Sequence, residues 1–209
     1  MRPYATVEGV STSEFEDRNS RFFGHVAPAS CEEEAVEFRH SIMAAIPEAS
    51  HYVSAYVFHD PAYEHYSDAK EPHGTAGLPV LNVIKGHGVE DVVCVVARIF
   101  GGTLLGRGGL MRAYTKAAQM AFETAQLVEV APCCDTLASF AYPLYEQVKA
   151  ALVAQGAHII GTDFADDVTV QYRTLEPDAP VVAAALTELC NGRIELFCDE
   201  PALHRIPKI

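Results

Sequence analysis

The apolar positions repeat with two different periods along the first part of the chain, so both strands and helices are expected. A turn-rich group separates Phe15 from the apolar run Phe22–Val26, which predicts a strand pair. A helix is expected to begin at Ser30, which has capping-box spacing to Glu33, and to end before Pro47. One face of this helix should be buried.

The middle of the chain continues with the same alternation of elements. His51–Phe58 is expected to form a strand, and the polar segment 59–72 a long loop. A short helix should follow from Leu78 and stop at Gly86 or Gly88. The β-branched run Val92–Ala97 is typical of a strand covered on both faces and therefore central in its sheet. A third helix over 110–125 presents small alanines that would allow close packing on that sheet.

A second pattern begins at residue 126. The expected elements are a strand at Gln126–Ala131, a helix at Pro143–Gln155, a hairpin of Ala157–Phe164 and Val168–Leu175, a helix at Pro180–Cys190 and a strand at Arg193–Cys198. The order β-α-β-β-α-β predicts a ferredoxin-like domain. The fold class is therefore α+β, with one domain over residues 1–125 and another over 126–209.

The composition of the chain argues against non-specific nucleic-acid binding, membrane insertion and secretion. The net charge of −13 excludes a polybasic nucleic-acid coat, and no non-specific DNA binding is expected. Apolar stretches are too short for a membrane span, and Met1–Ser20 lacks the apolar core of a signal peptide. The six cysteines form no C-x-x-C pair, which favours reduced thiols. We expect a soluble cytoplasmic protein without membrane contact.

Glycines, arginines and acids concentrate in two segments, 67–77 and 98–112, each of which precedes an expected helix. Glycines and free amides at a helix start, together with Arg98, Arg107 and Arg112, could form an anion or phosphate cradle. Alternatively, the glycines only permit a tight strand-to-helix crossing, and Arg98 or Arg112 pairs internally with Asp68 or Glu71. Residue types alone favour this structural interpretation slightly.

Other reactive side chains give weaker signals. The histidines and acids between residues 59 and 73 could ligate a metal, but none has the helical spacing of a zincin. Cys133 and Cys134 would point to opposite faces of a strand, which favours packing over redox chemistry. Ser67 and Thr75 have the hydroxyl typical of a helix cap. We therefore predict no metal, no cofactor and no catalytic residue.

The two segments resemble the IMPACT/YigZ family. Its patterns S-D-D-G-E-P-x-G-T-A-G-x-P and R-Y/F-F/Y-G-G-x-x-L-G-x-G-G-L-x-R-A-Y are matched by Ser67–Pro79 and Arg98–Tyr114. The candidate binding residues in these motifs are Asp68, Glu71, His73, Thr75, Arg98, Gly101, Gly102, Gly106, Arg107, Gly108, Gly109, Arg112 and Tyr114. Two departures stand out: Ala69–Lys70 replaces the usual Asp-Gly, and Ile99 replaces an aromatic residue.

The resemblance covers the whole chain and carries expectations about fold and function. It implies a ribosomal-protein-S5-domain-2-like fold for residues 1–125. It also implies that residues 126–209 are similar to the last domain of the translocation elongation factor.

Eukaryotic relatives regulate translation initiation by competing for an activator of a stress kinase. The leading hypothesis is thus a non-enzymatic regulator that binds the ribosome, structured RNA or a translation-associated protein. The alternatives are a small-molecule enzyme or binding protein for a phosphorylated or nucleotide ligand, and a protein-docking module that uses the segment 59–72.

Overall fold

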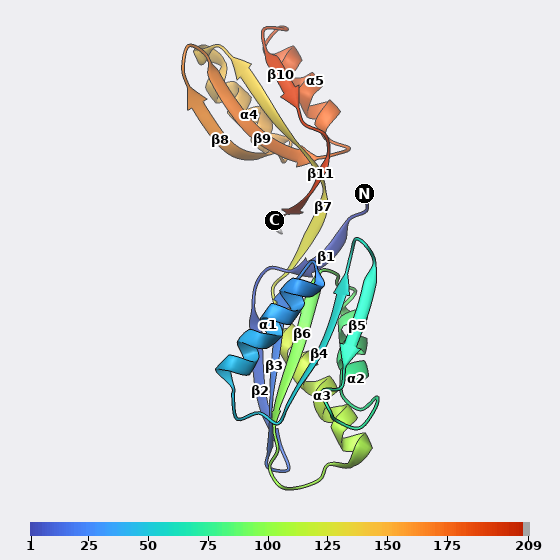
Figure 1. Ribbon diagram of the computed structural model, residues 1–209. Coiled ribbons are helices and arrows are strands. Elements are labelled where there is room, and N and C mark those ends of the chain that lie inside the picture. Colours follow the sequence, from blue (N-terminus) through green and yellow to red (C-terminus); the bar gives the residue numbers. More distant parts are fainter. Residues whose placement is uncertain (207–209) are drawn as a thin grey trace. The chain divides into compact units, whose positions relative to one another are not determined.

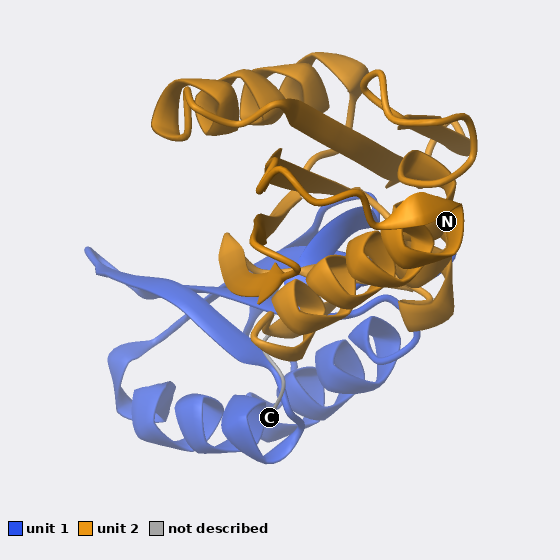
Figure 2. Ribbon diagram, turned by 90° about the horizontal axis from the view of Figure 1, so that it is seen from below, with its two compact units in different colours: residues 1–3, 130–206 blue, residues 4–129, 207–209 orange. Residues whose placement is uncertain are grey.

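The chain divides into two compact units in the computed structural model, which describes residues 1–206 (Figure 1). The N-terminal unit comprises residues 4–129, and the C-terminal unit comprises residues 1–3 and 130–206 (Figure 2). The division falls inside one long strand, β7 (Leu127–Phe140). Both units combine helices with antiparallel pairing, as expected for an α+β protein.

A five-stranded sheet forms the centre of the N-terminal unit. Its strands are β2 (Ser11–Asp17), β3 (Ser20–Pro28), β6 (Val92–Ile99), β4 (His51–Phe58) and β5 (Tyr63–Ser67), in the spatial order β2-β3-β6-β4-β5. The central position of β6 was predicted from its β-branched run, and that prediction is confirmed: residues 92–97 are completely buried. Both faces of this strand lie in apolar cores.

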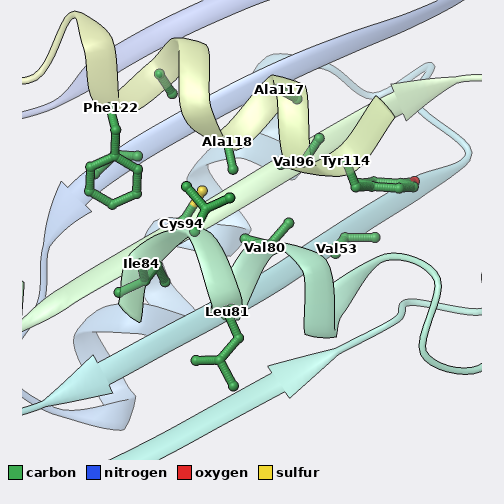
Figure 3. Packing of buried hydrophobic residues seen from close by; sticks show 14 of the residues in the cluster. Val53, Val80, Leu81, Ile84, Cys94, Val96, Tyr114, Ala117, Ala118 and Phe122 are labelled. Carbon is green, nitrogen blue, oxygen red and sulfur yellow. The ribbon is translucent and has the colours of Figure 1, made fainter. Parts of the chain in front are cut away.

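Helices cover the two faces of this sheet. The apolar side chains of α1 (Glu32–Ala45) pack with one face, while α2 (Gly77–His87) and α3 (Gly106–Glu123) share the core on the other (Figure 3). The expected close approach of α3 is confirmed at Gly24, where a Cβ atom would lie 2.4 Å from the carbonyl oxygen of Ala117. Small residues on both elements therefore set the helix-to-sheet spacing.

Two expectations for the N-terminal unit are wrong, and one strand was not predicted. The segment 59–72 is not one loop, because β5 lies within it and pairs with β4. The capping box is also wrong: α1 begins at Glu32, and both the backbone N–H and the hydroxyl of Ser30 donate to Glu34 Oε2, at 2.7 and 3.0 Å. A short strand, β1 (Tyr4–Val7), precedes the expected strand pair.

The C-terminal unit contains the expected β-α-β-β-α-β order. After β7 come a 3-10 turn (Tyr142–Leu144), α4 (Tyr145–Ala154), β8 (His158–Phe164), β9 (Val168–Leu175), α5 (Ala179–Leu189), β10 (Glu195–Cys198) and β11 (Ala202–Ile206). The order β7-β9-β8 is extended by β10 and β11, which also pair with β7. The strand β7 is longer than its sequence pattern predicted, and β11 was not predicted. Both errors concern strands that pair with residues distant in sequence.

No helix among residues 1–206 has the length and apolarity needed to cross a membrane.

Candidate binding site

The two segments singled out in the sequence lie together in the N-terminal unit. The loop between β5 and α2 and the loop between β6 and α3 line one cavity of about 450 Å³. The first loop contributes residues 70–72 and the second contributes Phe100, Leu104 and Leu105. Arg98 comes from the end of β6, and Gly106, Arg107 and Leu110 come from α3. His51 at the start of β4 completes the lining. Residues far apart in sequence therefore form one site.

A buried ion pair lies beside the cavity. Arg98 Nη1 donates to Glu71 Oε1 at 2.7 Å, and these side chains are only 5% and 4% exposed. The hydroxyl of Tyr114, from α3, donates to the same oxygen at 2.8 Å. Burial, followed by the negative charge of Glu71, raises the pKa of Tyr114, which keeps the hydroxyl protonated as a donor. Arg98 therefore connects β6 to the β5–α2 loop.

This pairing corrects one expectation about the site. Arg98 was grouped with the residues of an anion cradle, but Glu71 neutralises its charge inside the protein. The alternative of an internal arginine–glutamate pair is confirmed for Arg98. The guanidinium group also lies 5.4 Å from the ring centroids of both Phe22 and Phe100.

Gly101 fixes the loop that follows β6. Its N–H donates to Ser20 Oγ at 3.2 Å, and Arg98 Nη2 donates to the same hydroxyl oxygen at 3.3 Å. A Cβ atom at Gly101 would lie 2.0 Å from the backbone carbon and oxygen of Asn19. No L side chain fits at that distance, so this glycine serves the close approach of the loop to the β2–β3 turn.

Asp68 organises the start of α2. Its carboxylate accepts hydrogen bonds from the N–H groups of Gly74, Ala76 and Gly77, at 2.8, 3.1 and 2.8 Å. Burial alone would raise the pKa of Asp68, but these three N–H groups and the nearby His73 ring lower it overall. Asp68 is thus an anchor for the backbone at the helix start.

Two further candidate residues of the first loop differ in exposure. Thr75 is completely buried, and its hydroxyl donates to the carbonyl of Pro72 at 2.6 Å. The His73 side chain is 92% exposed, and its Nδ1 lies 3.7 Å from Asp68 Oδ2. The hydroxyl of Thr75 therefore shapes the loop, while the ring of His73 is open to solvent.

Three exposed cations lie at the start of α3 and on the facing loop: Lys70, Arg107 and Arg112, hereafter the cationic rim. Lys70 and Arg107 line the cavity, and Arg107 Nη2 donates to the carbonyl of His73 at 2.9 Å. Arg112 lies five residues further along α3, outside the cavity lining, and its Nη1 would be 3.5 Å from a Cβ atom built on Gly108. No acidic group among residues 1–206 forms an ion pair with any of the three.

The remaining glycines of the second motif have different roles. Gly102 and Gly106 have positive φ angles of 82° and 71°, which disfavour other residues. Gly108 is exposed, whereas Gly109 is buried, and a Cβ atom on Gly109 would meet the Cβ of Leu105 at 3.0 Å. The helix begins at Gly106 with no side-chain cap and no acid in its first turn. Its first N–H groups are therefore left for water or a ligand.

Several site residues escaped the sequence analysis. His51 Nδ1 forms a 2.8 Å hydrogen bond with the carbonyl of Ala69, and its partner in the strand register is Arg98. No local pattern could have shown this, because the contact depends on strand pairing. Phe100 and Leu104 are 44% and 80% exposed and form an apolar lip on the cavity. The position of Phe100 and Leu104 in a glycine-rich turn was the one sequence signal for their exposure.

The departure at Ala69–Lys70 has a backbone consequence. Both residues adopt positive φ angles, 47° and 70°. Glycine, which the family pattern has where Lys70 stands, takes this conformation without steric penalty. The substitution thus keeps the turn at some conformational cost and adds a cation to the cavity.

These features define a two-unit α+β protein with a ligand-sized, cation-rimmed cavity beside a helix start. The Impact N-terminal domain family matches residues 18–122, and the family described as a domain of unknown function (DUF1949) matches residues 139–193. The chain belongs to the IMPACT family, as its two motifs predicted.

Relatives and a solved structure extend this similarity over nearly the whole chain. IMPACT family member YvyE of Bacillus subtilis is 30% identical, over 94% of this chain and 91% of that protein. IMPACT family member YigZ of Escherichia coli is 32% identical, over 88% and 92%. A structure titled "Crystal structure of an hypothetical protein" matches with a TM-score of 0.63 and 28% identity, over 96% and 98% of the two chains. The similarity is therefore shared along nearly the full length of these proteins.

Proposed function

We propose that this protein is a non-enzymatic, cytoplasmic regulator of translation that binds the ribosome or structured RNA through the cationic rim. One observation carries the proposal: Lys70, Arg107 and Arg112 are exposed and form no ion pair with an acidic group of residues 1–206, although the chain has a net charge of −13. The net negative charge of the protein repels nucleic acid over most of its surface, so contact is confined to a local cationic surface. The free amides at the start of α3 add donors for a phosphate oxygen.

The fold supports the same proposal. The antiparallel sheets with helices are consistent with the S5-domain-2-like and ferredoxin-like folds that the family resemblance implies. Eukaryotic relatives of this family act on translation initiation. Structured RNA is recognised largely through its backbone and shape, which a rim of a few cations next to helix amides suits.

Sedimentation of purified ribosomes with this protein over a series of salt concentrations tests the proposal. The wild-type chain should co-sediment at low salt and dissociate as salt rises. The triple variant K70Q/R107Q/R112Q should bind more weakly, with the logarithmic salt slope reduced by about 0.7–0.9 for each phosphate that the variant no longer neutralises.

A matched control removes the same charge elsewhere. The triple variant R21Q/K116Q/K149Q changes three exposed cations outside the cationic rim and should bind as the wild type does. Equal loss of binding in both triple variants, binding that does not respond to salt, or no detectable binding would each refute the proposal.

The cavity itself supports a second candidate, the binding of a small phosphorylated or nucleotide ligand. Its volume of about 450 Å³ lies in the range of small-molecule sites, and apolar residues line it beside two of the rim cations. A thermal-shift screen of nucleotides and sugar phosphates tests this candidate, because a ligand that binds only the folded state raises the melting temperature.

The variant L104W separates the two candidates. Leu104 is 80% exposed at the cavity mouth, so a larger side chain there obstructs the cavity without removing a cation. Loss of ligand stabilisation with ribosome binding intact would assign the cavity to a small molecule. The absence of any thermal shift would exclude this candidate.

A further inference from the structure

Four aromatic rings form a block across β4 and β5, hereafter the aromatic ladder: Tyr56, Phe58, Tyr63 and His65. Tyr56 is directly opposite His65 in the strand register, and Phe58 is opposite Tyr63. Centroids of neighbouring rings are 4.8 to 6.5 Å apart, and their planes are 10° to 38° from parallel. Ring contacts of this kind stabilise cross-strand pairs.

The ladder is buried on one side and open on the other. Tyr56 and Phe58 are 4% and 6% exposed, and both belong to the core that α1 covers. Tyr63 is 49% exposed, and His65 is also exposed. The buried pair holds the open pair in place, so the two exposed rings present a fixed surface that loses little side-chain freedom on binding.

The exposed rings lie on an edge strand. β5 is the last strand in the order β2-β3-β6-β4-β5, and Figure 1 shows it at the border of the sheet. The opposite face of β5 is already occupied: Glu64 pairs with Lys85 of α2 at 2.8 Å, and Tyr66 packs against the α2–α3 core. A partner could therefore reach the strand edge and the ladder face together. Addition of an extended peptide to such an edge is a general mode of recognition.

The charges around the ladder favour a cationic partner. Residues 51–69, which include both strands, contain no Lys or Arg. The hydroxyl of Tyr56 donates to Glu32 Oε1 at 3.0 Å, and the first turn of α1 carries Glu32, Glu33 and Glu34. Aromatic faces attract Lys and Arg side chains, and nearby carboxylates strengthen that preference.

We propose that the aromatic ladder and the outer edge of β5 form a docking site for an extended protein segment that carries Arg or Lys. The backbone of the segment pairs with β5, and its cationic side chains lie on the exposed rings of Tyr63 and His65. This site does not include the residues of the cationic rim, and its ligand is cationic, whereas the rim is proposed to bind anionic RNA. The proposal is independent of RNA binding.

Single-stranded RNA also stacks on exposed aromatic side chains, but the charges argue against it here. Stacking platforms for nucleic acid are combined with cationic grooves that hold the phosphates. The ladder has a carboxylate at Tyr56 and no cation in either of its strands. An RNA ligand would thus gain stacking but lose the electrostatic attraction that dominates its affinity.

Fluorescence anisotropy with the full chain at physiological salt tests the site. The probes are a labelled peptide of alternating Arg and Thr, the same peptide with Gln in place of Arg, and an oligouridylate. The Arg–Thr peptide should bind best. The variant Y63A/H65A should weaken its binding about tenfold, as expected for two cation–π contacts.

Two controls make the result specific to the ladder. Y63F keeps the ring and should retain the peptide affinity. Y142A removes a tyrosine of similar exposure, 47%, from the C-terminal unit and should also leave the affinity unchanged.

Amide chemical shifts locate the contact. Titration with the Arg–Thr peptide should perturb the N–H groups of β5 in the wild-type chain. Unchanged affinity in Y63A/H65A, tighter binding of the Gln peptide or the oligouridylate, or shifts confined to other strands would overturn the proposal. A dimer that Y63A/H65A dissociates would also overturn it, because a second copy would then be the occupant.

Discussion

Removal of the buried cation at the site should destabilise the N-terminal unit strongly. In R98M, the carboxylate of Glu71 loses its closest ionic partner, since His51 Nε2 lies 3.8 Å from Glu71 Oε1 against 2.7 Å for Arg98 Nη1. The side chain of Glu71 is 4% exposed, so little solvation of its carboxylate compensates for the lost guanidinium group. Loss of one partner of a buried pair costs about 3–5 kcal/mol of unfolding free energy.

The chain contains a matched exposed pair for comparison. Arg21 Nη2 lies 2.6 Å from Glu14 Oε1, and these side chains are 47% and 51% exposed. The same substitution there, R21M, should cost about 0–1 kcal/mol, because water screens the pair. The comparison therefore contrasts a buried arginine–glutamate pair, together with the contacts of Arg98 to Ser20 and Phe22, with an exposed pair.

Native-state hydrogen exchange of β6 measures the effect within the N-terminal unit, without requiring the two units to unfold together. The slowest amides of β6 should exchange with a free energy lower by about 3–5 kcal/mol in R98M. The double variant R98M/E71M should recover about 1–3 kcal/mol of that loss, because the carboxylate is gone as well. Equal effects of R98M and R21M would refute the conclusion that the buried pair stabilises the site.

Three further predictions concern single residues of the two loops. G101A should lower the free energy of unfolding by about 1–3 kcal/mol or more, because its Cβ atom would overlap the backbone of Asn19. G108A should leave this free energy unchanged or raise it, because the nearest atom to its Cβ lies 3.5 Å away. Urea unfolding measures both variants. K70G should raise the free energy of unfolding by up to about 1 kcal/mol. Lys70 has a φ of 70°, and glycine relieves that strain, although glycine also loses more backbone entropy on folding. D68A should cost about 0.5–2 kcal/mol at pH 7. The pKa of Asp68 is lowered in the folded state, so its stabilisation is fully present above its ordinary pKa of 3.8 and is lost as pH falls through the folded-state pKa. Acid unfolding curves of D68A and the wild type should therefore converge below the folded-state pKa.

Local sequence patterns were enough to predict most helices and strands and the family. The unbroken β-branched run of β6 predicted a central strand, because only a strand covered on both faces tolerates apolar residues at every position. The alanines of α3 predicted a close helix–sheet contact for a similarly local reason. The two motifs identified the IMPACT family, since their glycine positions reflect backbone conformations that few residues share.

Which cationic side chains are accessible to a ligand depends on the folded chain and could not be read from the motifs. Arg98 and Arg112 lie in the same motif, yet Arg98 is buried against Glu71 and Arg112 is exposed on α3. That difference follows from strand register and helix phase, which bring together residues 27 positions apart in the case of Arg98 and Glu71. The same reasoning applies to β5, whose polar and aromatic residues resemble a loop until pairing with β4 makes them a sheet edge. Pairing between distant segments leaves no local periodicity, so it could be seen only in the folded chain.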